Sequence, residues 1–328
     1  MEKKTVVVTG IGGNVGQGIV RNLRLTGLPL RIIGTNVTDF SGGNHLVDEF
    51  YKVPYAFDPD FLPAMQAIVN QTNADLVVPS TDFEVYYLGK MQDSLGCLLA
   101  TSGENAAGIY LDKYLTWEHH QKFGIPFATS YLPSSYSGQF KNAIAKPRKG
   151  RGSRGLMKNN FDPKMLSDEE YMVQELFEGK EITTAVYRSY ITNQITGLLT
   201  MERSLENGAT NYCRVVYPFD TQLLAMAERM SECSDLKGSF NIQSIVTASG
   251  EIVPFEVNCR ISGTNSIRSH FGFKDVEYTV RELLYHEPAP KPEIRSGVAQ
   301  RILLDVIYPD VQDETELEKN ATDSFIIF

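Results

Sequence analysis

Apolar residues in the first hundred positions gather in short runs that alternate with amphipathic stretches. The runs are TVVVTG, LRIIG, ADLVVPS and CLLA, at 5–10, 30–34, 74–80 and 97–100. Stretches with the spacing of a helix lie between them, at 12–27, 60–72 and 82–91. This alternation is typical of strands that are buried on both faces and joined by crossover helices. It predicts an α/β domain with a parallel sheet.

The pattern changes after about residue 105. A helical stretch ends at Gly124, and short strands then flank a glycine-rich loop. Longer strands follow, with one amphipathic helix near 220–235 and a last strand at 298–308. We predict an α/β domain, then a linker helix with a small subdomain, then an α+β lobe with a C-terminal strand and tail. The expected ranges are 1–105, 106–180 and 181–328.

The strand within PFEVNCRISGT, at 254–264, carries a polar side chain at every second position. Ser249-Gly250 lies just before it and is a plausible two-residue hairpin loop. Pairing about this loop sets Gln243 opposite Glu256, Asn241 opposite Asn258 and Val246 opposite Val253. The expected core face is Phe240, Ile242, Val246, Val253, Phe255 and Val257. The expected polar face is Asn241, Gln243, Glu256, Asn258 and Arg260.

This polar face has the composition of a cation site. Carboxylate and amide oxygens are ligands that Mg²⁺ takes alongside phosphate oxygens. A solvated outer face more typically carries Lys, Thr and Glu, but an ordinary polar face stays the alternative for this hairpin taken alone.

A strand that ends near Lys146 precedes a basic loop. The loop alternates glycines with four cationic residues, Arg148, Lys149, Arg151 and Arg154. Glycines let backbone N–H groups approach an anion and the cations add charge, so the loop favours phosphate binding. It is not a Walker A loop, because no GK[ST] opens a helix. A surface turn is the plainer alternative.

Composition narrows the class of protein. The chain has 328 residues and a formal net charge of −9, so we expect no nucleic-acid partner and no anionic membrane surface. The start MEKKTVVVTG leads directly into a strand, and no apolar stretch reaches about 18 residues, so we expect neither signal peptide nor membrane span. Four scattered cysteines suit a reducing compartment, and we expect a cytoplasmic protein.

The first glycine loop, Gly10 to Gly16, is similar to a dinucleotide fingerprint. That fingerprint requires an acid at the end of the second strand, but Gly34-Thr35-Asn36 stands there. We expect the loop to serve close packing of a helix on the sheet. An NAD-dependent enzyme stays an alternative.

Five motifs follow one another in an order that resembles the ATP-grasp superfamily. They are Asp112-Lys113, Ala145-Lys146-Pro147 with GRGSRG, Gln174 to Glu181, Gln243, and Glu256-x-Asn258-x-Arg260. The similarity is closest to one half of the large chain of carbamoyl-phosphate synthetases and covers roughly residues 1–290. It implies an N-terminal pre-ATP-grasp domain, followed by an ATP-grasp domain that includes a small lid subdomain.

The resemblance implies how ATP would be bound. Lys113 and Lys146 would contact its phosphates, and Glu181 would bind the ribose. The adenine edge would pair with the backbone of Glu175, Leu176 and Phe177. The lid over the phosphates would span 150–155 and include Gly150, Arg151, Gly152 and Ser153.

The resemblance also implies the metal site and the catalytic residues. Mg²⁺ or Mn²⁺ would be held by Gln243, Glu256 and Asn258. Arg260 would reach the γ-phosphate and act in catalysis with Lys146. Arg268 and Arg203 are candidates to grip the substrate carboxylate, because arginine binds carboxylates in bidentate geometry.

Three histidines and one cysteine complete the expectations. His119 and His120 should lie on the surface of a helix, and His270 is a candidate to line the acceptor pocket. Cys259 stands where the family usually has proline and should face the core. The acid that often follows the ribose glutamate is absent, since Thr183-Thr184-Ala185 stands there.

The expected activity is that of an ATP- and Mg²⁺-dependent ligase. A small-molecule carboxylate would form an acyl phosphate and ADP, and an amine or related nucleophile would then displace phosphate. The chain is a single copy of a module that is duplicated in carbamoyl-phosphate synthetases, so carbamoyl phosphate synthesis by this chain alone is not expected. A nucleotide-binding sensor without ligase turnover is the alternative, and homodimerisation stays open.

Overall fold

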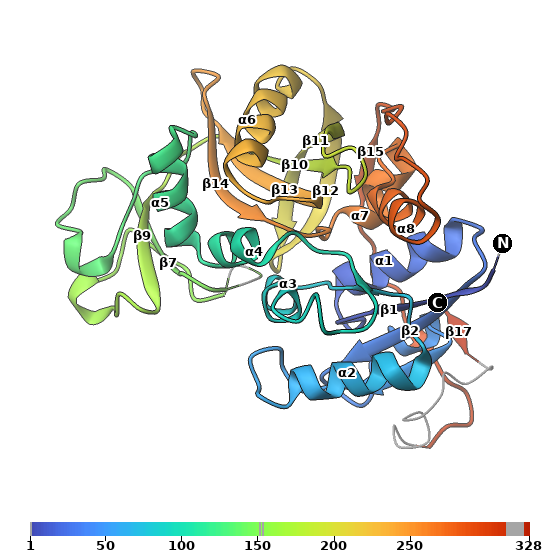
Figure 1. Ribbon diagram of the computed structural model, residues 1–328. Coiled ribbons are helices and arrows are strands. Elements are labelled where there is room, and N and C mark those ends of the chain that lie inside the picture. The colour runs from blue at the N-terminus through green and yellow to red at the C-terminus, as the bar shows by residue number, and fades with distance from the viewer. Residues whose placement is uncertain (1, 151, 153, 313–324) are drawn as a thin grey trace.

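The fold is described from a computed structural model, which covers residues 2–150, 152, 154–312 and 325–328. Three sheets organise it (Figure 1): a five-stranded sheet at the bottom, a six-stranded sheet at the top and a four-stranded sheet at the left. The sheets follow one another in the order of the three predicted parts, whose boundaries stay predictions.

The N-terminal sheet is parallel, as predicted, with strand order β3-β2-β1-β4-β5. Its strands are β1 (Lys4–Val8), β2 (Leu30–Asn36), β3 (Glu49–Lys52), β4 (Leu76–Val78) and β5 (Leu98–Leu99). The sequence analysis missed β3, because EFYK is only half-buried at the sheet edge and has no apolar run. The strand order reverses between β1 and β4, and the carboxyl ends of strands at such a point form the usual ligand crevice.

Helices cover both faces of this sheet. They are α1 (Asn14–Leu25), α2 (Phe61–Thr72) and α3 (Asp82–Gly89). Val6 and Val8 pack against α1 on one face, and Val7 packs against α2 on the other. The distant helix α8 (Asp275–Tyr285) joins the α1 face through Val276 and Val280. The N-terminal sheet and the C-terminal part of the chain therefore share one core.

The four-stranded sheet has the order β6-β9-β7-β8 and is the predicted small subdomain. Its elements and the two helices before it are α4 (Glu104–Leu111), α5 (Lys113–Phe123), β6 (Ser130–Tyr131), β7 (Ala143–Pro147), β8 (Met157–Lys158) and β9 (Tyr171–Glu175). Asp112 caps α5, since its side chain accepts from the amides of Tyr114 and Leu115. Gly124, in the left-handed conformation, ends α5 as predicted.

The six-stranded sheet is antiparallel, with the order β14-β13-β10-β11-β12-β15. Its elements are β10 (Lys180–Arg188), β11 (Ile195–Glu206), β12 (Ala209–Val216), α6 (Asp220–Cys233), β13 (Gly238–Val246), β14 (Ile252–Asn258) and β15 (Val298–Gln300). The predicted helix near 220–235 is α6, which packs on one face through Leu223, Met226 and Met230. Phe273 and Tyr278 cover the other face.

The hairpin of β13 and β14 differs from its prediction in one respect. Gln243 pairs with Glu256 and Asn241 with Asn258, as expected, but Val246 pairs with Ile252 and not with Val253. The turn is longer than two residues, so the strands pair one residue out of the expected register near it. Phe255 is the extra residue of a β-bulge, which restores the expected register beyond it.

The bulge also corrects the expected core face. Ile242, Val246 and Val257 are in the core, and so is Cys259, as predicted. Val253 and Phe255 instead line a cavity with Ile245. A change of register by one residue moves side chains to the other face of a strand. Val253 is therefore buried, as predicted, but on the other face from Ile242 and Val257, and the half-buried Phe255 was wrongly expected in the core.

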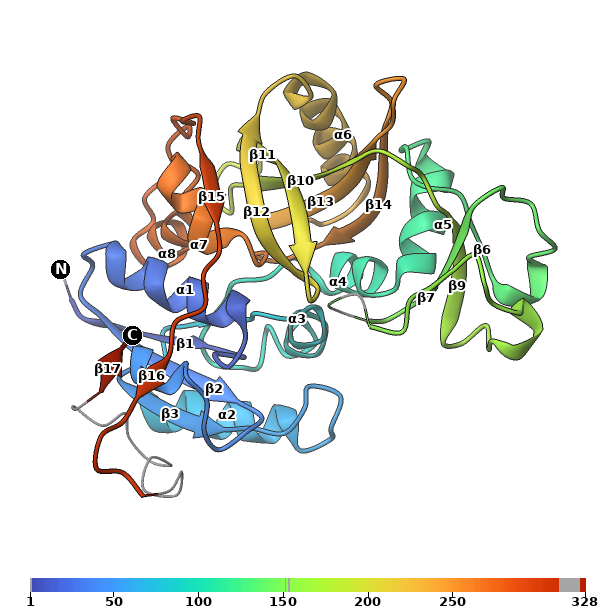
Figure 2. The same ribbon diagram turned by 180° about the vertical axis from the view of Figure 1, so that it is seen from behind.

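The C-terminal segment runs back along the molecule toward the N-terminal sheet (Figure 2). The predicted strand at 298–308 is two short ones, β15 and β16 (Val306–Ile307), and β16 pairs with β17 (Ile326–Ile327). The ring of Phe325 lies 4.8 Å from that of His45. The remaining short helices are α7 (Asn265–Arg268) and 3₁₀ turns at Asn44–Leu46, Pro133–Ser135, Pro163–Met165 and Ser269–Phe271.

His120 is fully buried, so its predicted surface position was wrong. Its ring lies 4.9 Å from that of Phe127, and Nδ1 lies 3.5 Å from the carbonyl oxygen of Pro126. Burial lowers the pKa of His120 from 6.5 to about 4. In the described part of the chain, no helix combines the length and apolar character needed to cross a bilayer.

The buried imidazole makes acid stability a test of this core. The unfolded chain protonates His120 near its ordinary pKa of 6.5, whereas the folded protein does so only near pH 4. Stability is therefore lost as the pH falls through this window, by about 3 kcal/mol from this group. We expect His120→Gln to flatten the pH dependence of the unfolding free energy between pH 6.5 and 4, measured by urea denaturation.

The exposed His270 supplies the control. His270→Gln should keep the wild-type slope. Equal slopes for both variants would contradict a buried, neutral His120.

Candidate active site

Two cavities meet at the polar face of β13 and β14. The smaller has a volume of about 310 Å³ and lies between the small subdomain and the six-stranded sheet. The larger, of about 700 Å³, lies between the six-stranded sheet and the crevice of the N-terminal sheet. Gln243 and Glu256 line both cavities, as do Gly150, Gly152 and Arg154 of the basic loop.

The smaller cavity brings the predicted nucleotide residues together. Those that line it are Lys113, Lys146, Gly150, Gly152, Glu175, Leu176, Phe177 and Glu181. Arg151 and Ser153 lie outside the described residues. Val253 and Phe255 of β14 add an apolar wall together with Ile245 of β13. A nucleotide has an apolar ring system and anionic phosphates, so an apolar wall next to cationic side chains suits it.

Lys146 is held at the floor of this cavity. Its Nζ atom donates to Oε1 of Gln174 at 2.7 Å and to the carbonyl oxygen of Phe255 at 2.9 Å. Burial lowers the pKa of Lys146 to about 7, although the Glu256 carboxylate acts to raise it. A phosphate beside Nζ would favour the charged lysine, so the position suits an anionic ligand.

Glu256 lies between the two cavities with its amide neighbours. Its Oε1 accepts from Nδ2 of Asn258 at 3.2 Å, and Nε2 of Gln243 donates to Oδ1 of Asn258 at 3.0 Å. Burial acts to raise the pKa of Glu256, but Lys113 and Lys146 outweigh it and hold the pKa below its ordinary value. The carboxylate is therefore ionised at neutral pH.

These groups fit a divalent cation only in part. Glu256 supplies the charged oxygen that Mg²⁺ prefers, and phosphate oxygens usually complete such a site. The oxygen of Gln243 already accepts from Arg203 at 2.6 Å, and that of Asn258 accepts from Gln243. Each amide oxygen has a second lone pair for a cation, but its carbonyl already serves one hydrogen bond. Among the described residues there is no cluster of three His, Cys, Asp or Glu side chains that could hold a metal ion.

Arg203 lines the larger cavity, and its guanidinium is held by this network. It donates to Glu181 from Nε at 2.8 Å and from NH2 at 2.6 Å, and it also reaches Gln243. It thus joins the predicted ribose ligand to a predicted metal ligand. Ile182 of β10 pairs with Glu202 of β11, so the next residues, Glu181 and Arg203, face each other as well. Opposite charges at facing positions of neighbouring strands were the signal for this contact in the sequence.

Arg260 lines the larger cavity and is paired across the molecule. Nε and NH2 donate to Oδ2 of Asp82, at 3.0 and 2.8 Å. Asp82 begins α3, just beyond the carboxyl end of β4. The sequence analysis missed Asp82, because nothing in VVPSTDFE marks which of its acids faces the six-stranded sheet.

Arg268 does not reach either cavity, so the structure does not support its predicted contact with a substrate carboxylate. Its side chain is fully buried and ion-paired with Asp275. Local spacing on a short helix cannot distinguish an inward from an outward arginine. His270 is exposed and lines neither of the two cavities.

The first glycine loop serves close packing, as expected. A Cβ at Gly16 would lie 2.5 Å from the carbonyl oxygen of Gly10. A Cβ at Gly12 would lie 2.5 Å from Nδ2 of Asn36, so the amide at the end of β2 fills the space beside the loop. The loop forms part of the larger cavity.

The basic loop is anchored before it enters the cavity. Arg148 forms an ion pair with Asp112 at 2.8 Å, and its carbonyl oxygen accepts from the amide of Lys113. Farther on, Gly152 approaches the turn of the β11–β12 hairpin, where a Cβ at Gly208 would lie 2.5 Å from its carbonyl oxygen. The hairpin turn therefore limits how the loop covers the cavity.

Comparisons with known proteins agree with this geometry. Residues 110–264 match the family model of the ATP-grasp domain, which confirms the resemblance found in the sequence. No curated protein matches the chain.

Solved structures show the same fold at low identity. The N5-carboxyaminoimidazole synthetase of Staphylococcus aureus, complexed with ADP, is 13% identical, with a TM-score of 0.73 over 92% of this chain and 82% of that chain. The corresponding synthetase of Thermotoga maritima is 18% identical, with a TM-score of 0.69 over 93% and 81%. The biotin carboxylase domain of the Hydrogenobacter thermophilus 2-oxoglutarate carboxylase, with MgADP and bicarbonate, is 12% identical, with a TM-score of 0.70 over 90% and 73%.

The hairpin turn provides a test of the loop's position. Gly208→Ala would add a methyl group 2.5 Å from the Gly152 carbonyl oxygen and would strain a backbone with a φ of +75°. The strain should cost about 1 kcal/mol of stability. Because the loop must also shift, we expect Mg-ATP affinity to fall about tenfold, measured by calorimetry.

Gly250→Ala is the matched control, since Gly250 has a φ of +85° and no atom within 4 Å of an added Cβ. It should lose similar stability and keep wild-type affinity. If both variants bind Mg-ATP equally, the contact between loop and hairpin has no part in binding.

Proposed function

We propose that this chain, whose residues 110–264 form an ATP-grasp domain, is an ADP-forming ligase that joins a carboxylate to an amine or related nucleophile. The family match and the solved structures support an ATP-dependent ligase in general terms. One observation carries the finer proposal: the two cavities, of about 310 and 700 Å³, share Glu256 in their linings. A transferable phosphoryl group would lie where the two cavities meet.

The smaller cavity would hold ATP. Lys146 and Lys113 lie where they can neutralise phosphate charge, and Ile245 and Phe255 offer apolar contact to the base. When ATP binds, Glu181 would release its ion pair with Arg203 and accept hydrogen bonds from the ribose hydroxyls instead. Mg²⁺, held by Glu256 with Gln243 and Asn258, would neutralise charge on the phosphates.

The reaction would proceed in two displacements. A carboxylate oxygen attacks the γ-phosphorus, the bond to the bridging oxygen breaks, and ADP leaves with that electron pair. The nucleophile then attacks the carbonyl carbon of the acyl phosphate, the carbon–oxygen bond breaks, and phosphate leaves while the amine loses a proton. Such transfer needs positioning and charge neutralisation, which Lys146 and Arg260 supply, and requires no covalent protein nucleophile.

The partners on this proposal are small molecules. A cytoplasmic location and homodimerisation stay predictions.

Ligand-dependent stability separates this proposal from a dinucleotide enzyme. Mg-ATP at one hundred times its Kd should stabilise the folded protein by about 2.7 kcal/mol, seen as a higher Tm. ATP with EDTA should give a smaller shift, because Glu256 and the phosphates then repel each other. A shift with NAD⁺ and none with Mg-ATP would contradict the nucleotide site.

The charge of Glu256 is the second test. Glu256→Gln keeps the size and one oxygen of the side chain but leaves the cations and the triphosphate less well compensated. We expect near-native stability and a decrease of about 10²-fold or more in carboxylate-dependent ADP formation.

Glu251→Gln is its control, because Glu251 is exposed on the turn of the same hairpin. That variant should form ADP at the wild-type rate. Wild-type turnover by a folded Glu256→Gln protein would refute the metal-ligand role, and loss of stability would make Glu256 a structural residue.

A further inference from the structure

The larger cavity is built for more than a minimal acid. At about 700 Å³ it has the volume of sites that enclose drug-sized ligands. A carboxylate of the size of bicarbonate or acetate would leave most of it filled with water. Its lining combines two kinds of chemistry, which indicates what kind of molecule it accepts.

Part of the lining is aromatic. Tyr55 and Phe57 line it and stack in parallel, with ring centroids 5.4 Å apart and planes 4° from parallel. Phe83 meets Phe57 edge-on at 6.2 Å. Tyr55 and Phe57 are 50% and 61% exposed, although large aromatic side chains are usually buried in a monomer. Two half-exposed rings at the mouth of a cavity form a surface for a planar or apolar group.

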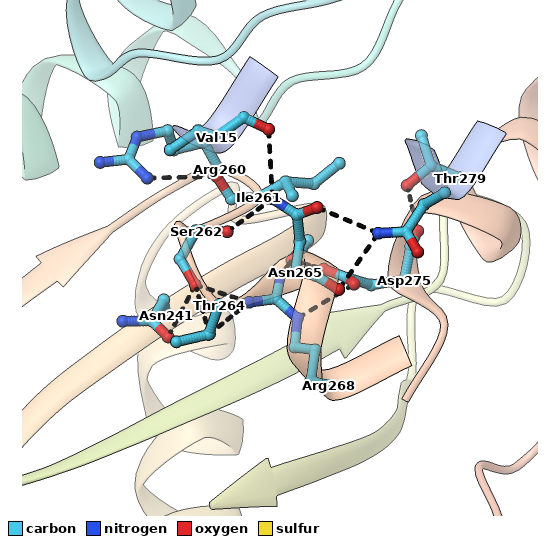
Figure 3. Close-up of polar contacts among 12 residues, drawn as sticks. Val15, Asn241, Arg260, Ile261, Ser262, Thr264, Asn265, Arg268, Asp275 and Thr279 are labelled. Atoms are coloured by element: carbon cyan, nitrogen blue, oxygen red, sulfur yellow. Dashed lines mark hydrogen bonds and ion pairs between the residues drawn. The ribbon is translucent and has the colours of Figure 1, made fainter. Parts of the chain in front are cut away.

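Another part of the lining is a buried asparagine. Asn241 lies on β13 beside the predicted metal ligands and is only 1% exposed, yet it lines the cavity. Its Oδ1 accepts from Thr183 at 2.9 Å and from Ser262 at 3.2 Å. Its Nδ2 has no hydrogen-bond partner among the residues that the structure describes. Figure 3 shows this nitrogen pointing away from Ser262 and Thr264.

Arg268 supports this orientation of the amide. Its NH1 donates to Oγ of Ser262 at 2.6 Å, and the guanidinium can only donate. Ser262 therefore accepts from Arg268, and its own proton is available for Asn241 or for Oγ1 of Thr264 at 3.3 Å. With the hydroxyl groups of Thr183 and Ser262 donating to Oδ1, the amide N–H groups face the cavity. The buried pair of Arg268 and Asp275 holds the chain of bonds in place.

We infer that the larger cavity binds the carboxylate substrate, and that this substrate is an acid with an aromatic or other planar apolar body. The inference rests on the proposed ligase function. A carboxylate oxygen would accept from Nδ2 of Asn241, beside the junction with the nucleotide cavity. The planar body would pack on Tyr55 and Phe57. An oxygen acceptor suits this position, because Nδ2 is a donor that faces the cavity.

The test uses hydroxylamine as a small nucleophile that converts any acyl phosphate to a hydroxamate. The protein is assayed with Mg-ATP, hydroxylamine and one acid at a time. The aromatic set is phenylacetate, cinnamate, phenylalanine, tyrosine and tryptophan, and the aliphatic set is acetate, bicarbonate, alanine and glutamate. We expect the best aromatic acid to exceed every aliphatic acid at least tenfold in kcat/KM.

Variants test the aromatic part of the lining and Asn241 separately. Phe57→Ala should raise KM for the aromatic acid about tenfold. The control Tyr212→Ala removes a comparably exposed ring from outside both cavities and should change nothing. Asn241→Asp places an acceptor where the donor was and should raise KM for every acid at least tenfold, with the Tm shift from Mg-ATP retained. Should Asn241→Asp fail to fold, Ser262→Ala frees the amide to turn and should raise KM severalfold.

The outcomes distinguish this inference from the proposed function. Equal or better turnover of small aliphatic acids, or a Phe57→Ala variant that behaves as wild type, overturns the aromatic substrate and leaves the ligase intact. No hydroxamate from any acid, despite a Tm shift with Mg-ATP, overturns the ligase itself.

Discussion

The carbonyl group of Phe255 is the point on which both cavities depend. A bulged residue has no partner in the strand ladder, so its carbonyl oxygen is free to accept from elsewhere. Lys146 donates to it at 2.9 Å from the small subdomain. The bulge thereby holds the buried lysine, and it also sets the side chains of β14 so that Phe255 faces the smaller cavity while Glu256 reaches the junction. Because of this one extra residue, β14 is apolar where it lines the smaller cavity and polar where the two cavities meet.

The walls of the two cavities are held by contacts between distant parts of the chain. The amide of Ala128 donates to the carbonyl oxygen of Pro254 at 2.7 Å, which docks the small subdomain on β14. On the other side, Arg260 pairs with Asp82 of the N-terminal domain. Asn265 adds a second tie, since its Nδ2 donates to the carbonyl oxygen of Val15 at 3.2 Å (Figure 3). The arrangement of the two cavities therefore depends on contacts of the six-stranded sheet with the small subdomain and with the N-terminal domain.

Local patterns in the sequence predicted most of this architecture. Short apolar runs that are buried on both faces located the parallel sheet, and the polar alternation of β14 located Glu256 and Asn258. The bulge was not predicted, although Pro254 was a signal for it, since proline inside a strand marks an edge or a bulge. Arg268 and His120 were misplaced because neither their charge nor their helical position shows what packs over them. Asp82 and Asn241 acquire their roles only from partners far away in the chain.

The central claim is that the nucleotide binds in the smaller cavity, across the bulge, and not at the first glycine loop. A crystal structure with Mg²⁺ and a non-hydrolysable ATP analogue tests it directly. The account predicts the base packed against Phe255 and Ile245, and Nζ of Lys146 within hydrogen-bond distance of a phosphate oxygen. Nucleotide density between Gly10 and Gly16, with the smaller cavity empty, would contradict it.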